Sequence, residues 1–121
     1  MKKILIIEDN KQGLEVLKEV LEHEGYSVVS ASDGINGLRF AKKELPDLIL
    51  LDLLLPKFSG FDICLKLAED DKTRKIPIII ISTLGEEKST YEKLKKFEII
   101  KFMKKPYNIE DLLAEIKKTL S

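Results

Sequence analysis

Apolar residues gather in five short runs along the chain, and most of these runs lack an alternation of apolar and polar positions. The runs are rich in Ile, Val and Leu and span residues 4–7, 27–31, 48–51, 78–81 and 99–103. Strands that are buried on both faces of a sheet have this pattern. We therefore predict five buried strands at these positions.

The segments between the runs carry apolar residues at helical spacing instead. Their apolar stripes comprise Leu14, Leu17 and Leu21; Ile35, Leu38 and Ala41; Phe61, Cys64, Leu65 and Ala68; and Ile109, Leu112, Leu113, Ile116 and Leu120. The segment 86–97 has fewer large apolar residues, namely Tyr91, Leu94 and Phe97. We predict a helix there that packs through a thin stripe. Asn108 is a suitable N-cap for the last helix.

Strands that alternate with helices indicate an α/β fold. Such a chain forms a parallel sheet, covered on both faces by helices in right-handed crossovers. The length of 121 residues suits one hydrophobic core. No linker or low-complexity segment interrupts the pattern. We therefore expect residues 1–121 to form a single domain.

Composition narrows the class of protein. The chain has 21 basic and 21 acidic side chains, and this balance argues against a generally nucleic-acid-binding or membrane-attracted surface. No run approaches the roughly 20 apolar residues that a membrane helix needs. Cys64 is the only cysteine, so an internal disulfide is impossible and we expect a cytoplasmic protein in which Cys64 packs in the core.

Four of the five predicted strands, all except the second, are followed by polar residues that could form a shared site. Ligands of open parallel α/β sheets bind beyond the carboxyl ends of the strands. In chain order, the residues at these ends are Glu8 and Asp9, Asp52, Ser82 and Thr83, and Lys105 and Pro106. We therefore expect three acids, two hydroxyls and a lysine to meet at one edge of the sheet.

This group of residues suits phosphoryl chemistry. Three neighbouring carboxylates repel one another unless a cation lies among them, and carboxylate oxygens suit Mg²⁺, with Mn²⁺ as an alternative ion. The metal would also neutralise an incoming phosphoryl group. Ser82 would donate a hydrogen bond to a phosphoryl oxygen, and Lys105 would pair with another. Asp52 would be the nucleophile and form an acyl phosphate.

In this order and at these spacings, the motifs resemble the receiver domain of two-component response regulators, in the CheY-like superfamily. The resemblance covers the whole chain and rests on Glu8–Asp9, Asp52 in LILLDLLLP, Gly60 in PKFSG, Ser82 in PIIIIST and Lys105–Pro106 in KFMKKPY. It implies a flavodoxin-like, doubly wound (βα)5 fold with strand order 2-1-3-4-5. It also implies a signalling switch that catalyses only its own phosphorylation and dephosphorylation. The phosphoryl group would come to Asp52 from a sensor histidine kinase or a histidine phosphotransfer protein.

The resemblance also implies roles for single residues. Asp9, Asp52 and the backbone carbonyl of Leu54 would bind the metal, and Glu8 would do so directly or through water. Ser82, Thr83, Lys105 and Phe102 would form the phosphoryl-binding and switch group, with Phe102 as the switch aromatic and a cis bond between Lys105 and Pro106. The family's output face, formed by helix four, strand five and helix five, would bind an unknown downstream protein or effector domain. The domain would be a monomer or a phosphorylation-dependent dimer.

The residues around the expected acyl phosphate lead to a further expectation. Thr83 is larger than the usual residue at its position. Leu54 and Leu84 are apolar at positions where the side chain influences how water reaches the acyl phosphate. We therefore predict slow self-dephosphorylation.

The start of the last strand departs from the family pattern. Glu98 and Ile99 stand where the family usually has Gly-Ala, so helix four must end differently. The identity of the output partner therefore stays open.

The same residues also allow other interpretations. Alone, Asp52 would be a structural acid held by backbone amides, Phe102 a core residue, and Ser82 and Thr83 the end of a strand. A phosphatase with an aspartate nucleophile needs a second acid where Leu54 stands. A flavin- or nucleotide-binding module needs a Gly, Ser and Thr loop where the chain has EDNKQG. A docking module that has lost phosphorylation is disfavoured because every reactive position is filled.

Overall fold

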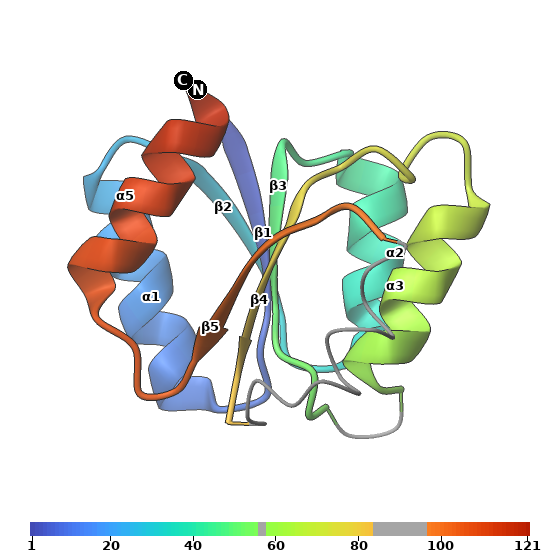
Figure 1. Ribbon diagram of the computed structural model, residues 1–121, viewed down its shortest axis with the longest axis horizontal. Helices are drawn as coiled ribbons and strands as arrows, with labels where there is room; N and C mark the ends of the chain where they lie inside the picture. The colour runs from blue at the N-terminus through green and yellow to red at the C-terminus, as the bar shows by residue number, and fades with distance from the viewer. Residues whose placement is uncertain (56–57, 84–96) are drawn as a thin grey trace.

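The computed structural model describes the chain except for residues 56–57 and 84–96. The strands form one parallel sheet in the order β2-β1-β3-β4-β5 (Figure 1). They are β1 (Lys3–Ile7), β2 (Ser27–Ala31), β3 (Leu48–Leu51), β4 (Ile78–Ser82) and β5 (Ile99–Lys104). The five predicted strands and the order 2-1-3-4-5 are therefore confirmed.

Helices cover both faces of this sheet. They are α1 (Lys11–His23), α2 (Gly34–Glu44), α3 (Gly60–Glu69) and α5 (Ile109–Leu120). Figure 1 shows α1 and α5 on one face and α2 and α3 on the other. Among the described residues, no helix is long and apolar enough to span a membrane. The arrangement is the doubly wound α/β fold that the alternation of strands and helices indicates.

Two cores lie on the two faces of the sheet, because successive residues of a strand point to opposite sides. Ile4 and Ile6 of β1 join the core beneath α1 and α5. Leu5 and Ile7 join the core beneath α2 and α3. All four side chains are fully buried, which explains why the central strands show no alternation of apolar and polar residues.

Helix ends follow the sequence closely. The side chain of Asn10 caps α1 by accepting a hydrogen bond of 2.9 Å from the backbone N–H of Gly13. Asn108 caps α5 in the same way, as predicted, by accepting a bond of 2.8 Å from the N–H of Glu110. A side-chain oxygen at this position satisfies one of the free N–H groups of the first helical turn.

The apolar stripes of two helices differ from the prediction. In α3 the predicted stripe included Leu65, which is 45% exposed, whereas the buried side chains include Ile63 and Leu67. In α2 the predicted first member of the stripe, Ile35, is 56% exposed. The buried residues of α2 are Gly34, Gly37 and Ala41. Apolar residues surround much of each helix, so spacing alone did not show which side meets the sheet.

Almost all of the predicted helix 86–97 lies outside the described residues. The chain enters β5 at Ile99, which pairs with Ile78 of β4, and the pairing then skips Ile100. Such an irregularity is a β-bulge, which bends a strand locally. The exposed Glu98, which stands with Ile99 where the family usually has Gly-Ala, therefore leads directly into a bulged strand.

Candidate functional site

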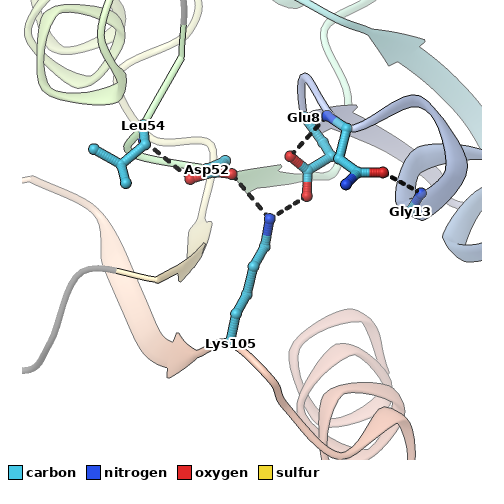
Figure 2. Close-up of polar contacts among 6 residues, drawn as sticks. Glu8, Gly13, Asp52, Leu54 and Lys105 are labelled. Carbon is cyan, nitrogen blue, oxygen red and sulfur yellow. Dashed lines mark hydrogen bonds and ion pairs between the residues drawn. The ribbon is translucent and has the colours of Figure 1, made fainter.

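The carboxyl edge of the sheet brings two acids and one lysine into contact. Glu8 follows β1, Asp52 follows β3 and Lys105 follows β5. Figure 2 shows the Lys105 side chain reaching between the two carboxylates. Its Nζ donates a hydrogen bond of 2.9 Å to Asp52 Oδ2 and another to Glu8 Oε1. The expected meeting of these residues is therefore confirmed.

Backbone pairing places the two acids side by side. Ile7 and Leu51 are register partners in neighbouring parallel strands, so the residues that follow them leave the sheet together. The backbone N–H of Asp52 donates to the carbonyl of Ile7 at 3.0 Å. The N–H of Glu8 donates to the carbonyl of Ala31 in β2, also at 3.0 Å. The backbone of both acids is thus held by the neighbouring strand.

Asp52 is buried, being 4% exposed, and both of its carboxylate oxygens have partners. Oδ2 accepts from Lys105, and Oδ1 accepts a hydrogen bond of 2.9 Å from the backbone N–H of Leu54 (Figure 2). A buried charge needs such compensation because leaving water is costly. The contact of the Leu54 N–H was not foreseen from the sequence, which predicted only a metal contact of its carbonyl.

Glu8 and Lys105 influence each other's protonation. Burial raises the pKa of Glu8, and hydrogen bonds from Lys105 and from the N–H of Asn10 oppose this only in part. Burial alone would lower the pKa of Lys105, but hydrogen bonds to Glu8 and Asp52 outweigh it, so the pKa of Lys105 is raised. The lysine therefore stays protonated and supplies positive charge between the acids.

Three carboxylates form a group that fits a divalent cation. One oxygen each from Glu8, Asp9 and Asp52 lies within 4.8 Å of the others. Glu8 and Asp52 are buried, whereas Asp9 is exposed and opens the group toward solvent. Hard carboxylate oxygens, with room for water on one side, suit Mg²⁺ or Mn²⁺. They suit Zn²⁺ less well, because zinc sites are rich in thiolate and imidazole ligands.

The remaining predicted site residues belong to β4, β5 and the residues that follow them. Ser82 ends β4 and is fully buried, whereas Thr83, the next residue, is exposed. Phe102 of β5 pairs with Ile80 and is 6% exposed, within the core beneath α2 and α3. The peptide bond between Lys105 and Pro106 is cis, as the resemblance implied.

Comparison with known proteins decides the family. The model of the family described as "Response regulator receiver domain" matches residues 4–117. The chain belongs to this receiver-domain family. Receiver domains are parts of response regulators, the signalling proteins of two-component systems.

Curated relatives of this receiver domain fall into two groups. It is 37% identical to the DNA-binding dual master transcriptional regulator RpaA of Synechocystis sp., over 99% of this chain and 49% of RpaA. It is 29% identical to the polar-differentiation response regulator DivK of Brucella anthropi, over 98% of this chain and 96% of DivK. The chain thus spans about half the length of most of the curated relatives it matches, and nearly the whole of DivK.

Solved structures share the same fold. Chemotaxis protein CheY4 of Vibrio cholerae superposes with a TM-score of 0.91 at 26% identity, over 99% of both chains. Response regulator TrrA of Thermotoga maritima, solved in complex with Mg²⁺ and BeF, superposes with a TM-score of 0.86 at 28% identity. That match covers 99% of this chain and 100% of TrrA.

A cleft runs from Glu8 of this receiver domain along α1. Its inner part has a volume of about 420 Å³ and is lined by Glu8, Lys105, Leu17 and Tyr107, among others. A second hollow of about 380 Å³ shares Leu17 and Tyr107 and continues outward to Val16. Sequence reasoning missed Tyr107, and its position two residues after Lys105 was the only signal that could have found it.

Proposed function

We propose that this receiver domain is a phosphorylation-dependent switch in which Asp52 accepts a phosphoryl group in a Mg²⁺-dependent reaction. One observation carries the proposal. The buried Asp52 carboxylate lies 2.9 Å from the Lys105 ammonium and within 4.8 Å of the carboxylates of Glu8 and Asp9. A nucleophile, a fixed cation and a set of oxygen ligands for a metal therefore share one small volume.

In the proposed step, a carboxylate oxygen of Asp52 attacks the phosphorus of a phosphohistidine. A new P–O bond forms while the P–N bond breaks, and the imidazole leaves with the electron pair of that bond and takes up a proton. The N–H of Leu54 holds one carboxylate oxygen, so that the group faces the donor in one orientation. Lys105 shifts part of its contact to a phosphoryl oxygen and stabilises the charge that gathers there.

Glu8, Asp9 and Asp52 would hold the divalent ion, together with the backbone carbonyl of Leu54. When bound, the ion neutralises charge on the phosphoryl oxygens. The similar protein TrrA was solved with Mg²⁺ and BeF, which supports a metal-dependent reaction here. The contact between Lys105 and Glu8 also keeps the Glu8 carboxylate turned toward Asp52 in the absence of the ion.

Ser82 and Phe102 are the proposed switch. Ser82 pairs with Lys104 in the β4–β5 register, directly before Lys105, so its backbone ends β4 at the edge where the phosphoryl group would bind. Recruitment of the Ser82 hydroxyl would favour the buried position of Phe102. The change would then alter the face that β5 and α5 contribute to recognition by a downstream protein or effector domain, while the helix-four part of the family's output face lies outside the described residues.

We propose that the phosphodonor protein approaches along the cleft beside α1. The cleft has charged Glu8 and Lys105 at its inner end and apolar Val16 and Ile109 at its outer end. Val16 is 61% exposed and Ile109 is 37% exposed, so both are available for contact. A helix that bears a phosphohistidine on an otherwise apolar face would match this arrangement. We place this reaction in the cytoplasm, where the unpaired thiol of Cys64 stays reduced.

The deciding experiment treats the protein with a small phosphodonor such as acetyl phosphate and Mg²⁺ and measures intact mass. We expect one added phosphoryl group. This adduct should not form when a chelator replaces Mg²⁺, and it should be absent in Asp52→Asn. Asp71→Asn is the matched control, because Asp71 is an equally sized acid whose side chain is 93% exposed, in the turn that follows α3. Failure to form an adduct under any condition would favour a docking module without phosphorylation.

A second experiment tests the docking cleft. Val16→Asp would slow transfer from a phosphorylated histidine kinase or phosphotransfer protein, because it places a charge on the apolar end. Phosphorylation by acetyl phosphate would be unaffected. Leu65→Asp is the control, because Leu65 is a similarly exposed apolar residue on α3, on the opposite face of the sheet. Equal effects of both variants would argue against this cleft.

Slow self-dephosphorylation is the last part of the proposal. Leu54 is 48% exposed next to Asp52, and Thr83 is exposed at the end of β4, while Leu84 lies outside the described residues. Replacement of Leu54 by Gln would place a group that orients water beside the acyl phosphate and speed its loss. The decay of phosphorylated protein in Mg²⁺ measures this. Rapid decay of the wild-type protein, unchanged by Thr83→Ala or Leu54→Gln, would contradict it.

A further inference from the structure

Gly37 is the fourth residue of α2, one turn after the N-cap Asp33, and glycine is a poor helix former. Glycine is less favourable than alanine in a helix interior because it loses more backbone freedom on folding. Gly37 is buried, and its N–H donates an ordinary helical bond of 3.0 Å to the carbonyl of Asp33. Its presence therefore calls for a reason in the packing.

The reason is the close approach of Ile7, the last residue of β1. A Cβ atom built on Gly37 would lie 2.7 Å from Cδ1, 2.9 Å from Cγ2 and 3.0 Å from Cγ1 of Ile7. Ile7 is fully buried, and its branched Cβ restricts rotation of the side chain. In a tightly packed core, rotation of Cδ1 relieves only part of this contact, and the close approach of Cγ2 transmits the rest to the strand or the helix.

Ile7 is also the point at which the site is attached to β1. Its carbonyl accepts the hydrogen bond of 3.0 Å from the N–H of Asp52, and the next residue along the chain is Glu8. A shift of the Ile7 backbone would therefore move the amide that positions the nucleophile. It would move a carboxylate of the metal-binding group at the same time.

We propose that Gly37 is a positioning residue for the metal and phosphoryl site. Because it has no side chain, α2 can press directly on Ile7, and this contact sets where β1 presents Glu8 and supports Asp52. The inference rests on the proposed function only for its metal-binding consequence. The backbone consequence at Asp52 can be measured without any metal.

The test is Gly37→Ala in the full chain, with two readouts. Binding of Mn²⁺ is followed by electron paramagnetic resonance, and the amide signal of Asp52 is followed by ¹⁵N NMR in metal-free protein. We expect the dissociation constant for Mn²⁺ to rise by about tenfold or more, the range seen when groups that orient metal ligands are altered. We expect the Asp52 amide signal to shift as its bond to Ile7 changes.

Gly13→Ala is the matched control. Gly13 is also a helix glycine near the site, but the three atoms nearest to an added Cβ all belong to the Asn10 side chain, at 3.5 Å or more. Both readouts should stay at the wild-type values. Ile7→Val provides a rescue, because it removes Cδ1, the atom nearest to the added methyl group. In the Gly37→Ala background it should restore part of the lost affinity and move the Asp52 signal back.

The outcomes separate this inference from the proposed function. A wild-type protein that binds neither Mn²⁺ nor Mg²⁺ contradicts the proposed metal site, and the Asp52 signal then decides the role of Gly37. A Gly37→Ala protein that matches Gly13→Ala in both readouts overturns the inference. So does a loss that Ile7→Val leaves unchanged. If Gly37→Ala alone does not fold, the double variant is compared with Ile7→Val, and equal readouts overturn the inference.

Discussion

The two faces of β1 are packed in opposite ways. On one face α1 presents three large side chains, Leu14, Leu17 and Leu21, to the sheet. On the other face the buried residues of α2 are Gly34, Gly37 and Ala41, which bring the helix backbone close. A long side chain can adapt to a changed neighbour by changing its rotamer, whereas backbone packed against a branched side chain can adapt only by moving as a whole. The α2 face therefore controls position at the site, and the α1 face mainly contributes burial.

The largest expected effect on stability comes from the α1 face. Leu21 is fully buried, so Leu21→Ala removes apolar burial and leaves a cavity. We expect a loss of about 2–5 kcal/mol in the free energy of unfolding, measured by urea denaturation. The affinity of the folded variant for Mg²⁺ should stay within about twofold of the wild-type value, because the position of β1 does not depend on this contact. A large loss of affinity would erase the contrast between the two faces.

The next largest effect on stability comes from the α2 face. Here an added atom overfills the packing, whereas Leu21→Ala leaves a cavity. In Gly34→Ala the new Cβ would lie 2.3 Å from the carbonyl oxygen of Phe58, in the loop between β3 and α3. Overpacking of this kind costs about 1–3 kcal/mol. Urea denaturation measures the loss, and the amide signals of residues 58–60 should shift. A stabilised Gly34→Ala variant would show that α2 does not need its close approach.

A smaller effect is expected where α2 ends. Leu45 follows the helix in the left-handed conformation, with φ of 46°. A side chain is strained there, whereas glycine is not, so Leu45→Gly should raise stability by about 1 kcal/mol or less. A thermal melt measures the gain. A decrease would mean that the half-exposed Leu45 side chain contributes more by packing than it costs in strain.

The smallest effect is expected at Cys64, which packs beneath α3 in the same core as Ile7. Burial raises the pKa of the Cys64 thiol to about 12, so the thiol stays protonated across the working pH range of the protein. A thiol reagent should therefore modify the native protein barely at all between pH 7 and 9, but modify it fully in urea. Rapid modification of the native protein would show that this face opens more readily than its packing indicates.

Much of the fold could be predicted from the sequence because the signals are local. A run of Ile, Val and Leu residues marks each strand, and Asn108 marks the start of α5. The stripe of α3 was placed wrongly because Phe61, Ile63 and Leu65 are all apolar, and only contact with the sheet selects among them. Spacing within a helix does not contain that information.

In the candidate site, too, some features follow from the sequence and others depend on the folded chain. Its residue types and their places after the strands follow from the sequence, as does the meeting of the acids and Lys105 at one edge of the sheet. The second contact of Lys105, with Glu8, and the N–H of Leu54 beneath Asp52 required the folded chain. These contacts depend on how far β1, β3 and β5 extend beyond the sheet and how their loops turn.

By itself the sequence determined where strands and helices form, because hydrophobic periodicity and capping act between residues that are close along the chain. It also determined which chemical groups stand at the strand ends. Tertiary structure alone decided which side of α2 and α3 is buried and how closely α2 approaches Ile7. Such distances arise from packing between elements remote in sequence, where one methyl group is enough to move a backbone.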